Sequence, residues 1–268
     1  MKKDSIDTKI NDFFSVRIDK EVAILRFREN MLLPLIDSIN RDRLINHIDK
    51  LSREPSIKVI LMLHNPYKTG YKDYFNFYRN LTVQEADRNI LYMLGNVVNR
   101  LILNIVKSDK FFIHAGSGET ISMILNIGLA CDYRIVGEDT LFHNPYIDLG
   151  VLPKGGGPFF LLHKLGRSKA YEMLLFRKTL SAREALKLGI LDKIVPNPGL
   201  EEAALKAAHR FGQIPSRTLS GIKKLVNYSI QDLEDYLKTE NQEIWKISEG
   251  YLRNHYNQLD GKFKAIEI

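Results

Sequence analysis

The feature that most constrains the fold is a pair of short apolar runs separated by an amphipathic helical pattern. Residues 22–27, VAILRF, and 59–63, VILML, are short apolar runs with β-branched residues, bounded by polar residues, which predicts two buried strands. Between them, apolar residues of the segment 35–54 recur at three- and four-residue spacing, as on one face of a helix. A strand, a helix and a second strand in succession favour a parallel βαβ unit.

Further along the chain the same alternation continues and then stops. A helix is expected near 83–107, a strand at 111–116, and a helical then extended stretch over 118–136. Residues 153–157 predict a glycine-rich turn that opens a helix, and 181–196 a short helix followed by a strand. After residue 197 only helical patterns remain. We therefore expect an α/β core over 1–197 and a C-terminal helical lobe over 198–268.

Composition excludes several classes of protein. A hydrophobic content of 44% is typical of a globular chain, and the single cysteine excludes an internal disulfide. The sequence holds neither a signal-peptide pattern nor an apolar run of membrane-spanning length, so we expect a cytoplasmic protein that does not bind membranes. The net charge of +7 comes from scattered lysines and arginines, and no nucleic-acid-binding motif accompanies them. We therefore expect no nucleic-acid partner.

From residue 110 to 196 the chain resembles the enoyl-CoA hydratase (crotonase) superfamily. The resemblance rests on KFFIHAGSG, ACDYRIV, the run EDTLFHNPYIDLGVLPKGGG, and the continuation from RSKAYEMLL to LGILDKIVP. Their order and spacing together are specific, whereas each piece alone would be weak. The resemblance implies an α/β fold, a crotonase-like spiral of ββα units, with a C-terminal helical lobe. It also implies a homotrimer or a dimer of trimers.

The chemistry that the resemblance implies is stabilisation of an enolate-like oxygen on a coenzyme A thioester. In the family, two backbone N–H groups form an oxyanion hole, one in the loop after the third strand and one at a helix N-terminus. By register these donors fall at Tyr71, after Gly70, and at Met123. The family's glycine triplet is replaced here by Ser122-Met123-Ile124, which narrows the pocket or alters the turn.

Hydratases of the family use two glutamates as acid and base. The matching positions here are Asn126 and Tyr146. An amide cannot act as a carboxylate base, and a tyrosine with an unperturbed pKa near 10 is a poor one. Ordinary hydration is therefore not expected.

Several functions without that pair of glutamates remain open. Decarboxylation needs no base, and a tyrosine at position 146 resembles the methylmalonyl-CoA decarboxylase branch. Lys72 or Lys154 could hold the leaving carboxylate of a coenzyme A or carrier-protein thioester. The alternatives are a non-catalytic acyl-CoA-binding or assembly paralogue, and a thioester hydrolase with a water held by Asn126 and His143.

The remaining candidates are weaker. Asp148 would face the same side as Tyr146 on an extended segment, and His143 precedes the predicted site loop. His114 is expected to be a core histidine, and Asp132 to have a structural role. No metal ion or separate cofactor is implied, because coenzyme A enters as part of the substrate.

Overall fold

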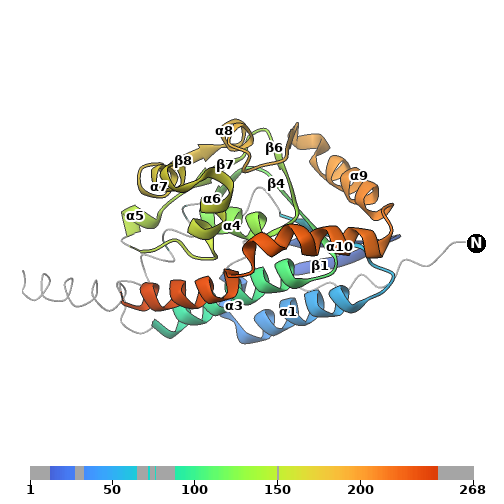
Figure 1. The fold of residues 1–268 in the computed structure, drawn as a ribbon, viewed down its shortest axis with the longest axis horizontal. Helices are drawn as coiled ribbons and strands as arrows, with labels where there is room; N and C mark the ends of the chain where they lie inside the picture. Colours follow the sequence, from blue (N-terminus) through green and yellow to red (C-terminus); the bar gives the residue numbers. More distant parts are fainter. Residues whose placement is uncertain are drawn as a thin grey trace, which may run out of the picture.

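The computed structural model describes residues 13–27, 33–64, 72, 76, 88–149 and 151–246. Its main element is a six-stranded sheet with the strand order β1-β2-β3-β4-β6-β9 (Figure 1). The first two strands pair antiparallel, and every later neighbour pairs parallel. The strands are β1 (Phe14–Asp19), β2 (Val22–Phe27), β3 (Val59–Leu63), β4 (Phe111–Gly116), β6 (Tyr133–Gly137) and β9 (Lys193–Val195).

A second, three-stranded sheet has the order β5-β7-β8. Its strands are β5 (Glu119–Ile121), β7 (Leu141–His143) and β8 (Thr179–Ser181). The first pair is parallel and the second antiparallel. Because β5 runs directly into the helix α4, this small sheet positions the start of that helix.

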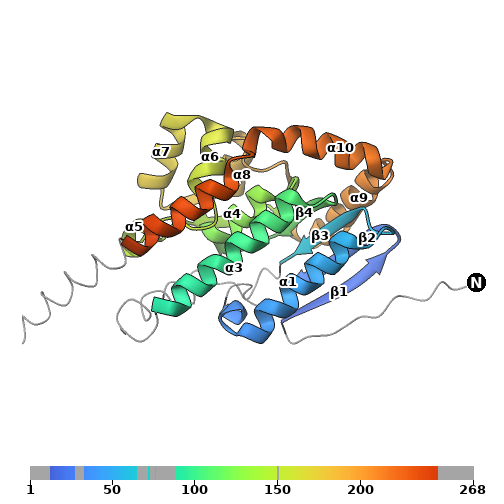
Figure 2. The ribbon, with the colours of Figure 1, turned by 60° about the horizontal axis from the view of Figure 1, so that its bottom comes forward.

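Helices cover both faces of the main sheet. In Figures 1 and 2, α1 and α3 lie side by side, and the helical residues 233–246 run alongside α3. The described α-helices are α1 (Ser38–Arg53), α3 (Arg88–Lys107), α4 (Ser122–Ala130), α5 (Tyr146–Leu149), α6 (Gly157–Leu165), α7 (Arg167–Leu175), α8 (Ala182–Lys187), α9 (Leu200–Gly212) and α10 (Ser216–Asn227). The described short 3-10 turns are Leu33–Ile36, Asn197–Gly199 and Tyr228–Ile230.

The strands alternate their side chains between two apolar layers. One layer gathers the β3 residues Ile60 and Met62 with side chains of α1, α3 and α4. The other gathers Val59 and Leu61 with residues of α9, whose Ala204 is fully buried. A parallel sheet buried on both faces needs apolar residues at every position, which explains the uninterrupted VILML run.

The single cysteine, Cys131, follows α4 and is buried in the first of these layers. Its Sγ donates a hydrogen bond to the Ile127 carbonyl at 3.5 Å. Burial raises the pKa of this thiol to about 12.

The structure confirms the predicted strands 22–27, 59–63 and 111–116 and the parallel pairing of β2 with β3. The turn at 153–157 opens α6 as expected. The division at residue 197 stays a prediction, although α9 packs directly on the main sheet. In the parts of the chain that the structure describes, no helix is long and apolar enough to cross a membrane.

Candidate active site

The predicted oxyanion-hole donor Met123 lies in the first turn of α4, directly after β5. The N-cap residue Ile121 is extended and offers no side-chain cap. The N-terminus of a helix carries partial positive charge, which favours an anion near the first-turn N–H groups. The Met123 side chain is 1% exposed and belongs to the core, so it replaces a glycine without lining open solvent.

Asn126 lies one turn further along α4 and is 3% exposed. Its Nδ2 donates a hydrogen bond to the Lys154 carbonyl at 2.8 Å. A Cβ atom placed on Gly157 would lie 2.6 Å from the same Nδ2, so this close approach requires the glycine. Asn126 therefore ties α4 to the turn 153–157.

Tyr146 begins α5 and is 2% exposed. The segment is helical rather than extended, so the expectation that Asp148 faces the same side as Tyr146 is wrong, because positions i and i+2 of a helix diverge. Asp148 instead forms an ion pair with Lys178 at 2.9 Å. Its carboxylate therefore has a local partner on the surface.

His143 and Asn144, which lie shortly before α5, have structural partners. His143 ends β7, and its Nε2 lies 3.3 Å from Glu119 Oε2. The Asn144 Nδ2 donates to carbonyls at the end of α7, including that of Leu174 at 3.3 Å. These contacts fix the loop that carries Tyr146.

Lys154 is 5% exposed, and its ammonium lies 3.6 Å from Glu240 Oε1. Burial lowers the pKa of Lys154, while Glu240 opposes that shift. Burial likewise raises the pKa of Glu240, which Lys154 opposes. The lysine expected to hold a substrate carboxylate thus already holds one from the helical residues 233–246, which we call the C-terminal helix.

Glu240 was not predicted from the sequence. The signal for it was available, because Leu233, Leu237 and Glu240 follow one another at helical spacing on one buried face. A carboxylate at the third of these positions indicates an internal partner.

For three predicted site residues the structure does not give the surroundings of the side chain. Gly70 and Tyr71 lie outside the described residues. Lys72 is described alone between them and further undescribed residues, and it is exposed. The first donor of the predicted oxyanion hole therefore stays a prediction.

Two buried imidazoles lie close together, that of His64 directly after β3 and that of His114 within β4. The rings of His64 and His114 are 4.5 Å apart, and His64 also stacks on Phe27 with 5.0 Å between ring centroids. Among the described residues, neither ring nitrogen of His64 has a hydrogen-bond partner. Burial lowers the pKa of His64 to about 4 and that of His114 well below its usual value. The prediction that His114 is a core histidine is confirmed.

Asp132 also has the predicted structural role. Its Oδ2 accepts a hydrogen bond from the Phe112 N–H at 2.7 Å and one from Lys223 Nζ at 2.8 Å. It thereby joins β4 to the helix α10.

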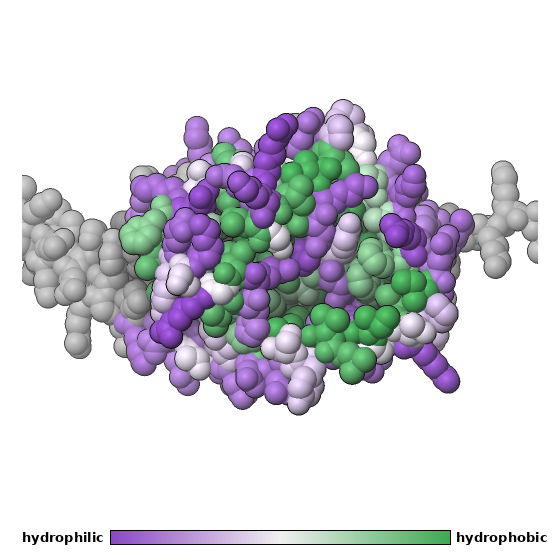
Figure 3. Space-filling model, turned by 45° about the horizontal axis from the view of Figure 1, so that its top comes forward, coloured by the Kyte–Doolittle hydropathy of each residue, from purple (hydrophilic) through white to green (hydrophobic). Residues whose placement is uncertain are grey.

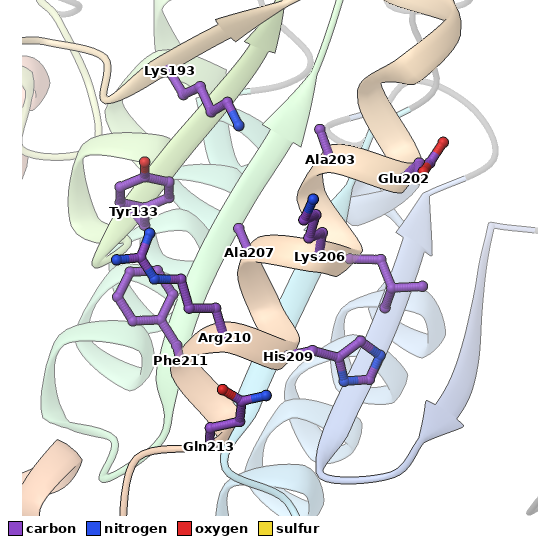
Figure 4. A pocket seen from close by; sticks show the side chains of 11 residues that line it. Tyr133, Lys193, Glu202, Ala203, Lys206, Ala207, His209, Arg210, Phe211 and Gln213 are labelled. Carbon is purple, nitrogen blue, oxygen red and sulfur yellow. The ribbon is translucent and has the colours of Figure 1, made fainter.

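A separate groove of about 700 Å³ lies against α9, near β6 and β9 (Figure 4). Figure 4 shows Arg210 directed toward Tyr133, with Lys193 beyond them. Asn126, Tyr146 and Lys154 do not line this groove. It is distinct from the candidate site.

Solved structures share this architecture. An enoyl-CoA hydratase from Bacillus halodurans superposes with a TM-score of 0.77 at 20% identity, covering 90% of this chain and 99% of that one. An enoyl-CoA hydratase from Geobacillus kaustophilus gives a TM-score of 0.72 at 20% identity, covering 95% and 96%. These likenesses establish the crotonase fold.

Proteins that are similar in sequence include further enoyl-CoA hydratases. A probable mitochondrial enoyl-CoA hydratase of Dictyostelium discoideum is 34% identical over 128 residues, which is 48% of this chain and 46% of that protein. The 2,3-dehydroadipyl-CoA hydratase of Escherichia coli is 25% identical over 187 residues, covering 70% and 71%. A peroxisomal bifunctional enzyme of Pongo abelii is 28% identical, and the match covers 28% of its length. The chain thus spans less than half the length of the Dictyostelium and Pongo relatives.

The family model for enoyl-CoA hydratase/isomerase matches residues 19–248. The chain belongs to this family.

Proposed function

We propose that the chain binds an acyl thioester, stabilises an enolate in an oxyanion hole and does not act as an ordinary hydratase. The observation that carries this proposal is that the family match spans residues 71 and 123 while positions 126 and 146 hold an amide and a phenol. The amide nitrogen of Asn126 is moreover engaged by the Lys154 carbonyl. Backbone donors survive a change of side chain, whereas loss of both glutamates removes the carboxylate acid–base pair that hydration uses.

Among the reactions that need no base, we favour decarboxylation of a malonyl-type thioester. Loss of carbon dioxide leaves the enolate directly, with the carbon–carbon electron pair moving onto the thioester oxygen. Tyr146 would contact the leaving carboxylate or protonate the enolate carbon. Lys154 is less suited to hold the carboxylate, because its ammonium already lies beside Glu240. The thioester could be presented by coenzyme A or by a carrier protein.

Replacing Tyr146 with phenylalanine is expected to lower kcat/KM for a malonyl-type thioester by about a hundredfold or more, because the phenol supplies a proton or a hydrogen bond. The measurement is carbon dioxide release, paired with calorimetric titration of coenzyme A and short acyl-CoAs. Tyr171→Phe is the matched control, because Tyr171 is exposed on α7.

The same assay distinguishes the alternatives. Thioester binding without turnover would favour the acyl-CoA-binding or assembly paralogue. Release of free thiol that is sensitive to Asn126→Ala would identify a thioester hydrolase. If no thioester binds, every version of this function is wrong.

A homotrimer or dimer of trimers remains part of the proposal. Figure 3 shows exposed hydrophobic patches separated by hydrophilic side chains. Exposed apolar residues on or next to α7 and α10 include Phe176 at 80%, Leu225 at 79% and Val226 at 65%. Sedimentation equilibrium is expected to give three or six times the chain mass, and a monomer at micromolar concentration would contradict this.

A further inference from the structure

The turn 153–157 is held by a carboxylate from a distant part of the chain. Gly155 and Gly156 adopt left-handed conformations, with φ of 83° and 69°. Their consecutive N–H groups donate to the two oxygens of Glu240, at 2.9 and 2.8 Å. Glu240 lies in the helical residues 233–246 and is 6% exposed.

The surroundings of this carboxylate suit an anion. Successive backbone N–H groups in a turn can form a concave anion-binding nest, and the N-terminus of α6 follows directly. The Lys154 ammonium balances the charge from 3.6 Å away and also donates to the Asn241 side chain. Glu240 is therefore the internal ligand of a nest in its own chain.

The helix α3 contacts both Lys154 and Asn241. A Cβ atom on Gly95 would lie 2.6 Å from Lys154 Cε, so a larger residue there would displace the end of the lysine side chain. Asn241 donates to Asn96 Oδ1 at 3.0 Å and accepts from Asn99 Nδ2 at 3.2 Å. The C-terminal helix, α3 and the turn thus share one buried polar cluster.

One hydrogen bond connects this cluster to Asn126 of the candidate site. The carbonyl of Lys154, the residue before the nest, accepts the hydrogen bond from Asn126. Gly157, the residue after it, packs against the Asn126 amide. Whatever fixes the turn therefore also fixes Asn126.

We infer that Glu240 is a positioning residue, whose carboxylate locks the C-terminal helix onto the turn 153–157 and thereby sets the shape of the thioester site. The functional half of this inference rests on the function proposed above. Docking of the helix and formation of the site are then a single event.

The test compares the full-length chain with its Glu240→Gln and Glu240→Ala variants by hydrogen exchange over peptides that cover 153–157. Exchange at Gly155 and Gly156 is expected to be at least about tenfold faster in both variants. Glu243→Gln is the matched control, because this glutamate lies on the same helix and pairs with Lys246 at the surface. Unchanged exchange in both Glu240 variants would overturn the inference, and the glutamine variant, which keeps the volume, decides alone if the alanine variant does not fold.

Two further readouts separate positioning from simple packing. Sodium acetate should slow exchange again in Glu240→Ala but not in the wild type, because a free carboxylate can enter the emptied nest. Sodium chloride at the same ionic strength should not slow it. Failure of the acetate rescue would contradict the role of the carboxylate. The Kd of a bound acyl-CoA should rise about tenfold or more in Glu240→Gln. Faster exchange with an unchanged Kd would refute the positioning role. A wild type that binds no thioester would refute the proposed function, and the exchange comparison alone would then test whether Glu240 holds the C-terminal helix on the turn 153–157.

Discussion

Replacing Lys223 with methionine should lower the free energy of unfolding by about 3–5 kcal/mol, which is typical when one partner of a buried ion pair is removed. Lys223 on α10 is 5% exposed, and its Nζ lies 2.8 Å from Asp132 Oδ2. The same nitrogen donates to the carbonyls of Ile105 and Lys110, each at 2.8 Å. The variant would leave a buried carboxylate and two carbonyls without this donor. Urea unfolding at neutral pH measures the loss.

Two comparisons sharpen this experiment. Lys224→Met changes the neighbouring lysine, which is exposed and pairs with Asp109 at the surface, so its effect should stay within about 1 kcal/mol. Adding Asp132→Asn to Lys223→Met should restore part of the loss, since the uncompensated charge disappears. A single-variant loss no larger than that of Lys224→Met would show that the ion pair does not anchor α10.

The stability of the chain should fall on acidification through His64, and His64→Phe should reduce this dependence. The folded-state pKa of about 4 lies below the ordinary value of 6.5, so between these values the unfolded chain binds the proton more readily. The contribution of His64 is therefore complete above about pH 6.5 and is lost as the pH falls toward 4. Between about pH 7 and pH 4.5 it amounts to about 2 kcal/mol.

The measurement is urea unfolding of wild type and variant at both pH values. Phenylalanine keeps a flat ring against Phe27, and any packing change cancels when each protein is compared with itself. His163→Gln, at an exposed position on α6, is the control and should follow the wild type. An equally steep loss of stability in His64→Phe would show that other groups cause the acid sensitivity.

The main sheet could be predicted because its strands are buried on both faces. VILML is a continuous apolar run, and VAILRF and FFIHAG are each interrupted by one residue, Arg26 and His114, which is the pattern of strands buried on both faces. β1 and the three short strands of the second sheet were not predicted. FSVRID alternates weakly, and three-residue strands such as Leu141–His143 are too short for a periodic signal.

The candidate site was predictable only as positions along the chain. The resemblance located Asn126 and Tyr146, and the structure gives their burial, but no local pattern indicates that the Asn126 amide is held by the Lys154 carbonyl. That bond joins residues 28 positions apart. The hydrogen bonds between Glu240 and the N–H groups of Gly155 and Gly156 join residues more than 80 positions apart, and such pairings depend on tertiary packing.

The buried thiol of Cys131, directly after α4, can report how often the surrounding core opens to solvent. Only a thiolate attacks an alkylating reagent quickly, and a pKa of about 12 leaves almost none of it while the core is closed. Labelling of Cys131 therefore proceeds at the frequency with which the layer around α4 loosens. The rate of labelling therefore reports how often the native packing around α4 opens.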